Sequence, residues 1–281
     1  MVVALPALLT FAVFSWWPII RGLSMSVHRT TFVGPDAWAG PNNFEYVLTD
    51  PRLVTATLNT AEFAVLAIVF GFPLPLTLAV IVSTVSGRAR RLFAALAYLP
   101  VIVPPVVAIL LWKLLFDPGP TGLLNTVLGA AGLGPFAWLN SPELAMPSIV
   151  AQATWAGAGT SVLIYLAALT SVRAELYEAA ALDGAGVLNR IWHVTLPQIR
   201  NVILVMLLLQ IIGATQVFTE PFLMTGGGPE DSTLTILLLM YRYAFGGEGD
   251  YGAATALGAL LAVVLAALSG IYLRLTRRWQ Q

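Results

Sequence analysis

The chain lacks cysteine altogether and contains only two histidines. The absence of thiols excludes disulfides and thiolate metal sites. His28 and His193 are too few for a histidine-based metal centre, so we expect no metal site in this chain. The equal numbers of basic and acidic residues argue against a nucleic acid as a partner.

Charged residues are also scarce. They make up 10% of the chain, whereas an ordinary soluble domain carries about 25%. Hydrophobic residues make up 58%. So few charges cannot cover a globular surface with water-compatible groups, and the composition therefore predicts a membrane protein. We expect an all-α fold, because a helix satisfies its own backbone hydrogen bonds in lipid.

Six stretches carry about 20 mostly apolar residues each, enough to cross a bilayer as a helix. They are Met1–Ile20, Phe63–Val85, Leu92–Trp112, Leu144–Val172, Asn201–Thr219 and Tyr251–Leu273. A seventh stretch, Leu234–Tyr241, is too short to span and should lie on the surface or pack into a loop. The first stretch has no charged leader and no clear cleavage site, so we interpret it as a span rather than a signal peptide. Its abrupt apolar start suggests a preceding cytoplasmic tail.

The basic residues predict the orientation of these spans. One side of the membrane collects nine of them: Arg88, Arg90, Arg91, Arg173, Arg190, Arg200, Arg274, Arg277 and Arg278. The other side has five: Arg21, Arg29, Arg52, Lys113 and Arg242. We therefore expect both termini and the loop 173–200 on the cytoplasmic side of the membrane.

Prolines interrupt two of the expected spans. They are Pro73 and Pro75 in the second, and Pro100, Pro104 and Pro105 in the third. Proline removes a backbone hydrogen bond and kinks a helix. Such kinks either border cavities or merely shape the packing, and the residues do not decide between the two.

No carboxylate or histidine lies in the core of any expected span. Ion-coupled carriers usually keep such groups at mid-membrane depth, so a secondary transporter is only our first alternative. The single lysine, Lys113, has no glycine-rich phosphate loop around it, so the chain cannot hydrolyse ATP in that way. A membrane-embedded enzyme is the second alternative, but no HExxH or GxSxG motif occurs, and we expect no catalytic activity. Active transport would then need a second protein docked on the cytoplasmic loop.

The loop 173–200 has the pattern of a compact docking knob. Ala174–Leu182 is rich in strong helix formers, and Asp183 and Gly184 then permit a turn. A second short helix is expected at about Val187–Val194, ended by Pro197. The alternative is an ordinary amphipathic loop that covers the membrane surface.

A family resemblance supports docking. The pattern Glu178-Ala179-Ala180-x-x-Asp183-Gly184-Ala185, followed by Val194-x-Leu196-Pro197, resembles the Glu-Ala-Ala loop of permease subunits of binding-protein-dependent ABC importers. The chain departs from the usual pattern at Ile191, Val194 and Asn201, and none of these removes a hallmark residue. The resemblance implies that the coupling set is Glu178, Ala179, Ala180, Asp183, Gly184, Ala185, Leu196 and Pro197.

Other segments resemble the sugar-importer branch, of the maltose and glycerol-phosphate type, and its first permease of a pair. They are Asn59-Thr60, Leu115-Phe116-Asp117-Pro118 with Gly122-Leu123-Leu124-Asn125, and Thr225-Gly226-Gly227-Gly228-Pro229 with Thr233, Tyr241, Ala244-Phe245 and Tyr251-Gly252. The resemblance covers nearly the whole chain. It implies one permease domain over 1–281 with the type I importer fold, six spans, and the coupling loop at 173–200.

The same resemblance implies a multi-pass protein of the bacterial inner membrane, and it implies the partners. These are a second permease subunit, two cytoplasmic ATPase subunits that bind ATP and Mg²⁺, and an external solute-binding protein. No cofactor is expected in this chain itself. In such importers the coupling loop sits in a cleft of the ATPase, and closure of the ATPase dimer switches the permease between inward and outward opening.

A sugar needs hydrogen-bonding side chains for its hydroxyls and flat aromatic faces for its C–H patches. Candidates at membrane depth are Gln152, Trp155 and Tyr165 on the fourth span, and Gln210, Thr215, Gln216 and Phe218 on the fifth. Gln152 and Trp155 are three residues apart, so they share a helix face. The alternative role is hydrogen bonding between subunits.

Overall fold

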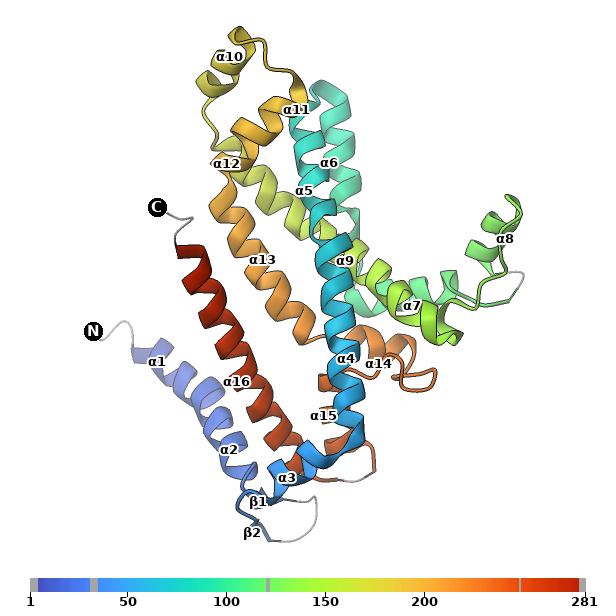
Figure 1. Cartoon of the computed structure of the whole chain (residues 1–281), viewed down its shortest axis with the longest axis vertical. Coiled ribbons are helices and arrows are strands. Elements are labelled where there is room, and N and C mark those ends of the chain that lie inside the picture. The colour runs from blue at the N-terminus through green and yellow to red at the C-terminus, as the bar shows by residue number, and fades with distance from the viewer. Residues whose placement is uncertain (1–4, 31–34, 120–121, 248, 278–281) are drawn as a thin grey trace.

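The computed structural model describes residues 5–30, 35–119, 122–247 and 249–277. Long helices run along one axis, with α10 at one end and α3 with a small hairpin at the other (Figure 1). Two parts of our expectations, Met1–Ala4 of the first span and Arg278, lie outside the described residues.

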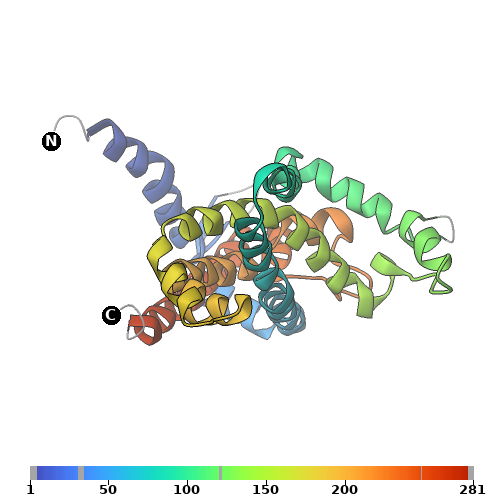
Figure 2. The ribbon, with the colours of Figure 1, turned by 90° about the horizontal axis from the view of Figure 1, so that it is seen from above.

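The first helical stretch runs from Leu5 to Met25 without a break and forms α1 (Leu5–Phe11), η2 (Ala12–Trp16) and α2 (Trp17–Met25). Its first part, α1 with η2, has no buried residue and projects away from the rest of the molecule (Figure 2), whereas α2 packs against α16. Two short antiparallel strands follow, β1 (His28–Arg29) and β2 (Ala37–Trp38), with His28 paired to Trp38. Helix α3 (Asn42–Thr49) completes this end of the protein.

The second span is longer than the sequence indicated. It begins at Pro51 rather than Phe63 and consists of α4 (Pro51–Leu66), η3 (Ala67–Gly71) and α5 (Pro73–Thr84). Pro73 has no N–H to donate, and the turn before it widens, so that Phe72 N donates to Ala67 O five residues back at 2.9 Å. The prolines therefore reshape this helix without dividing it.

The third expected span, Leu92–Trp112, is not one straight helix. Helix α6 (Gly87–Ile102) and helix α7 (Pro105–Leu115) meet at an angle of 99°. Val103 is held in an extended conformation because the residue before a proline avoids helical angles, and Pro104 itself cannot continue the helical hydrogen bonding. The proline pair makes a corner rather than a kink.

The fourth span is α9 (Pro142–Thr170), a single helix of 29 residues that starts two residues before the predicted Leu144. It follows α8 (Leu123–Gly129) and the short 3₁₀ turn η4 (Trp138–Asn140). The buried side chain of Asn125 holds this connection together. Its Oδ1 accepts from Phe136 N and from Trp138 Nε1, both at 3.0 Å.

After α9 come the helices of the coupling loop: α10 (Ala174–Leu182), α11 (Val187–Arg190), η5 (Ile191–Thr195) and α12 (Leu196–Gln198). The second helix thus continues through Pro197, whereas we predicted that Pro197 ends it. The break comes at Ile199, where this helical stretch meets α13 (Arg200–Thr215) at 73°. A widened turn at Ile191–Thr195, with Leu196 N donating to Ile191 O, accommodates the proline.

The helix of the fifth expected span, Asn201–Thr219, is shorter than predicted. Helix α13 ends at Thr215, and Gln216 to Phe218 leave helical geometry before α14 (Thr219–Met224) begins. The last helices are α15 (Ile236–Phe245), which contains most of the seventh apolar stretch, and α16 (Tyr251–Thr276), the predicted sixth span. Among the described residues, four helices are long and apolar enough to cross a membrane, or six if each bent pair counts as one span.

The buried residues form three apolar clusters rather than one core. One joins α3, α4, α15 and α16, the second joins α4, α7, α9 and α13, and the third joins α5, α9 and α13. Helix α9 takes part in two of them and is packed closely against α6, where a Cβ on Gly159 would lie 2.9 Å from Ala97 O. The exposed apolar surface is extensive, as in a chain surrounded by lipid or by partner subunits.

Candidate functional site

The coupling loop is built around a helix end that requires glycine. Gly184 has a φ of +76°, Ala185 N donates to Ala180 O at 2.9 Å, and Gly184 N donates to Ala181 O at 3.1 Å. These two bonds form a Schellman motif, in which a residue in the left-handed conformation closes the helix. The turn that the sequence predicted at Asp183 and Gly184 is thereby confirmed, with Asp183 as the residue that caps α10.

The two helices of the loop are joined by side chains. The hydroxyl of Tyr177 on α10 lies 3.1 Å from Oγ1 of the buried Thr195, and Thr195 Oγ1 donates to Arg190 O at 3.3 Å. This contact fixes the angle at which α10 leaves the rest of the loop. Tyr177 and Thr195 were not among the residues that the sequence predicted to be important in this loop.

The outer face of the loop is apolar and exposed. Leu182 is 90% exposed, Leu188 72% and Trp192 66%. Large apolar groups so open to solvent at the end of a protein mark a contact surface. Nothing in the described chain covers this face.

The predicted coupling residues all lie on this knob. Glu178, Ala179, Asp183, Gly184 and Pro197 are exposed, and Ala180, Ala185 and Leu196 are half-buried. Within the described residues, the carboxylate of Glu178 makes no hydrogen bond or ion pair.

A polar cavity lies where the fifth span breaks. Its volume is about 260 Å³, and three of the predicted substrate residues line it together: Gln210, Gln216 and Phe218. Gln216 has non-helical backbone angles, and its exposed side chain lines the cavity. Its Nε2 donates a long hydrogen bond of 3.3 Å to Ile212 O. Glu220, which the sequence reasoning missed, adds a half-buried carboxylate to the same cavity.

The structure does not bring the other four candidates to this cavity. Gln152 and Tyr165 are both 1% exposed and sit inside the chain's own packing. Thr215 Oγ1 donates to carbonyls of its own helix, Ile211 O and Ile212 O. Trp155 lines a separate apolar cavity and packs on Trp112 with 5.8 Å between ring centroids. Gln152 and Trp155 thus differ in environment, although they are three residues apart.

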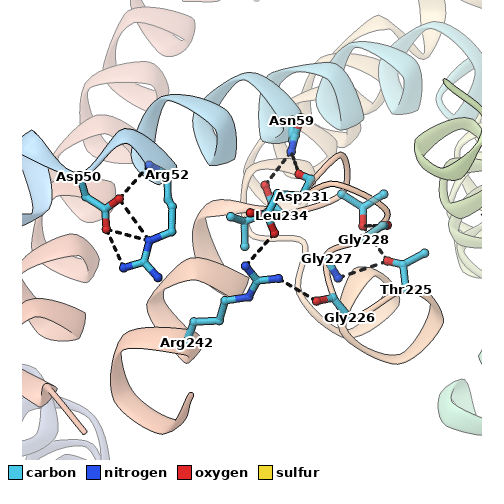
Figure 3. A network of polar contacts seen from close by, with 11 residues as sticks. Asp50, Arg52, Asn59, Thr225, Gly226, Gly227, Gly228, Asp231, Leu234 and Arg242 are labelled. Atoms are coloured by element: carbon cyan, nitrogen blue, oxygen red, sulfur yellow. Dashed lines mark hydrogen bonds and ion pairs between the residues drawn. The ribbon is translucent and has the colours of Figure 1, made fainter. Parts of the chain in front are cut away.

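The glycine-rich loop between α14 and α15 is clamped by side chains from distant elements (Figure 3). Asn59 Nδ2 on α4 donates to Asp231 O at 2.6 Å and to Leu234 O at 3.0 Å. Arg242 on α15 pairs with the Asp231 carboxylate at 2.8 Å and donates to Gly226 O at 3.0 Å. Asn59 therefore contacts the loop that contains the Thr225–Pro229 run, so two segments that carried the resemblance belong to one structural unit.

A second polar network lies beside this loop, at the start of α4. Asp50 caps α4 by accepting from Arg52 N at 2.8 Å, and its carboxylate also accepts from the Arg52 guanidinium and from the Tyr243 hydroxyl at 2.7 Å. Burial on its own raises the pKa of Asp50, but the hydrogen bonds from Arg52 and Tyr243 and the Arg52 charge outweigh it, so the pKa is lowered. This cap was not among the features predicted from the sequence, although an Asp-Pro dipeptide is typical of a helix start.

Comparison with known proteins identifies the family. Residues 71–281 match the family model described as the binding-protein-dependent transport system inner membrane component. The chain is 32% identical over 273 residues to the arabinooligosaccharides transport system permease protein AraP of Bacillus subtilis (strain 168), covering 96% of this chain and 86% of that protein. It is 31% identical over 274 residues to the trehalose/maltose transport system permease protein MalF of Thermococcus litoralis, covering 97% of this chain and 92% of that protein.

Two further matches widen the range of solutes. The sn-glycerol-3-phosphate transport system permease protein UgpA of Pectobacterium atrosepticum is 33% identical over 284 residues, covering 99% of this chain and 93% of that protein. A chain in the crystal structure of a bacterial ABC transporter that imports the acidic polysaccharide alginate superimposes with a TM-score of 0.87 and 30% identity, covering 99% of this chain and 94% of that chain. The protein therefore belongs to the family of inner membrane components of binding-protein-dependent transport systems and is a transport subunit rather than an enzyme.

Proposed function

We propose that this chain is one of two permease subunits in the inner membrane of a bacterium, in an ABC importer for a saccharide. The relatives support this solute class, because two are named for oligosaccharide or disaccharide transport and another for a phosphorylated polyol. An ion-coupled carrier gains no support from the family or from the sequence of the span cores.

The observation that carries the proposal is the exposed, glycine-closed knob of the coupling loop. Its apolar face and the unpaired carboxylate of Glu178 fit a cleft on a partner protein. We assign that cleft to the cytoplasmic ATPase subunits, which bind ATP and Mg²⁺; two such subunits and a solute-binding protein complete the importer. In one solved relative, the alginate transporter is in complex with an alginate pentasaccharide-bound periplasmic protein.

The proposed topology has six spans, with each bent helix pair crossing the membrane once. The chain runs from α1 to the hairpin end, and α16 runs back from that end, so the outer ends of α1 and α16 both point towards the end that carries α10 (Figure 1). The excess of basic residues on that side assigns it, and with it both termini, to the cytoplasm. The hairpin and α3 then face the solute-binding protein.

The proposed solute path passes the polar cavity at the break between α13 and α14. Amide groups of Gln210 and Gln216 hydrogen-bond sugar hydroxyls, and the ring of Phe218 offers a flat apolar face. Non-helical backbone at membrane depth is tolerated where it lines a cavity, which favours a pathway here over simple packing. Gln152, Tyr165 and Thr215 act as packing residues in this arrangement, and Trp155 stays outside the path.

The complete transporter in liposomes tests this assignment. Gln210→Ala and Gln216→Ala should raise the half-saturation for saccharide uptake by roughly tenfold, because one buried hydrogen bond to a ligand contributes on the order of 1–3 kcal/mol. Asn201→Ala, an exposed residue at the other end of α13, is the matched control and should leave uptake unchanged. Native half-saturation in both glutamine variants would move the solute path elsewhere.

A further inference from the structure

An apolar groove lies between α5, α6 and α9, apart from the polar cavity at the α13–α14 break. It encloses about 620 Å³ and is lined by hydrocarbon, apart from the Thr154 hydroxyl and the indole of Trp155. Leu74, Leu78, Leu96 and Ala97 form much of its wall. A groove of this composition at membrane depth suits a hydrocarbon chain rather than a polar solute.

A cluster of arginines lies on the helix that forms one wall of the groove. Arg88, Arg90 and Arg91 occupy the first turns of α6, and all three are exposed. Within the described chain none of them has an ion pair, and α6 has no acidic residue in its first turn. Three cations at the positive end of a helix are also unfavourable for that helix, which leaves them in need of an anion.

The spacing along α6 links the charges to the groove. Arg90 and Ala97 are seven residues apart, which places them on the same helix face about 10 Å apart along the axis. Arg90 therefore lies about two turns from the groove on the same face of α6, with Arg88 and Arg91 beside it at the start of the helix. In the proposed topology this end of α6 lies at the cytoplasmic membrane surface, and the groove continues from it into the hydrocarbon region. Figure 1 shows the start of α6 at the same end of the bundle as the coupling loop.

We propose that this groove binds one anionic phospholipid, with the headgroup on the arginine cluster of α6 and an acyl chain between α5, α6 and α9. The charge complementarity selects an anionic headgroup, since clustered basic residues beside membrane helices attract such lipids. The groove supplies the apolar contact that a surface charge cluster alone would not have. This site is separate from the solute path and does not depend on which solute is imported.

Native mass spectrometry of the complete transporter in mild detergent tests the proposal, with phosphatidylglycerol and phosphatidylcholine as probes. The wild-type complex should retain phosphatidylglycerol in preference to phosphatidylcholine. Arg88→Gln with Arg90→Gln should weaken phosphatidylglycerol binding roughly 25-fold, because each basic side chain near an anionic lipid contributes about fivefold. Arg274→Gln with Arg277→Gln, at the exposed end of α16, is the control and should bind as the wild type does.

A second variant tests the groove itself. Ala151 is exposed and lines the cavity, so Ala151→Phe should fill it without disturbing a buried core and should abolish lipid retention. Equal retention of both lipids by the wild type, or full retention by the arginine and Ala151 variants, would overturn the proposal. Efficient cross-linking of Ala151→Cys to the second permease would also overturn it, because the groove would then be a subunit interface.

Discussion

At the residue scale, single polar side chains hold together segments that lie far apart in the sequence. Asn59 reaches the loop before α15, and Asp50 joins the start of α4 to Tyr243 on α15. These hydrogen bonds fix the positions of loops that apolar packing alone would not fix. The side chain of Asp50 is 7% exposed and that of Arg52 is 34% exposed, so their ion pair is partly shielded from water.

The lowered pKa of Asp50 gives a pH-dependent prediction. A carboxyl with a depressed folded-state pKa contributes stability above its unfolded value of about 3.9, and this contribution is lost as the pH falls through the folded value. Asp50→Asn should therefore destabilise the protein at neutral pH, on the order of 1–3 kcal/mol, because Arg52 and Tyr243 lose a charged acceptor. Thermal unfolding in detergent should show the difference from wild type shrink as the pH falls below about 4.

Asp36→Asn is the matched control for this experiment. Its partner Arg21 lies 3.9 Å away and both side chains are about half exposed, so the pair should contribute little at any pH. An Asp50 variant as stable as the Asp36 variant at neutral pH would show that the network is unimportant for stability.

At the element scale, helix ends rather than helix cores decide the shape of this protein. The proline pair at Pro104–Pro105 makes a corner in the third span, and the glycine at the end of α10 closes the coupling loop. Two spans of similar apolar character therefore differ: α9 is one continuous helix of 29 residues, whereas α6 and α7 meet at 99°.

The coupling loop offers a prediction with an internal control. Gly184→Ala should reduce ATPase stimulation by the loaded binding protein, because a side chain at a φ of +76° strains the turn by about 1 kcal/mol. Gly184→Pro should abolish it, because proline cannot adopt this φ and lacks the N–H that bonds Ala181 O. Gly186→Ala is the control, since Gly186 has a φ of −67° and open space around it.

The measurement is ATP hydrolysis by the complete transporter in liposomes, with membrane insertion checked separately. Normal stimulation in Gly184→Pro would mean that the turn geometry has no part in coupling. A loss of stimulation in Gly186→Ala as well would point to the length or flexibility of the loop rather than to its left-handed residue.

At the scale of the whole molecule, the chain exposes more apolar surface than its own packing can bury. The N-terminal part of the stretch Leu5–Met25, α1 with η2, stands apart from the remaining helices, whereas α2 packs against α16 (Figure 2). The described chain buries no residue of α1 or η2, so this part of the helix gains packing only from lipid or from a partner subunit. The three separate apolar clusters likewise suit a subunit whose remaining contacts lie in a larger assembly.

The topology can be tested with single cysteines, since the native chain has no thiol. Asn189 in the coupling loop and Glu230 in the glycine-rich loop are both exposed and lie at opposite ends of α13 and α14. Asn189→Cys should react with a membrane-impermeant reagent only in inside-out vesicles, and Glu230→Cys only in intact cells or right-side-out vesicles. Labelling of both cysteines from the same side would contradict the six-span topology.

The sequence by itself determined the membrane class, the helical fold, the α10 boundaries and the turn at Gly184. These follow from composition, from runs of apolar residues and from local backbone chemistry, none of which needs a distant contact. The Glu-Ala-Ala pattern is also local, so its resemblance could be read directly from the residues.

Only the tertiary structure decided where the spans bend and which polar residues meet. Pro104 in the sequence indicates a break in the third span, but it does not give the 99° angle between α6 and α7, because that angle depends on packing against the other helices. Gln152 and Gln210 are both polar residues expected at membrane depth, yet Gln152 is buried in the chain's own packing and Gln210 lines a cavity. Helical periodicity gives the face of a residue, whereas only the arrangement of neighbouring helices determines whether that face meets a protein core or an open cavity.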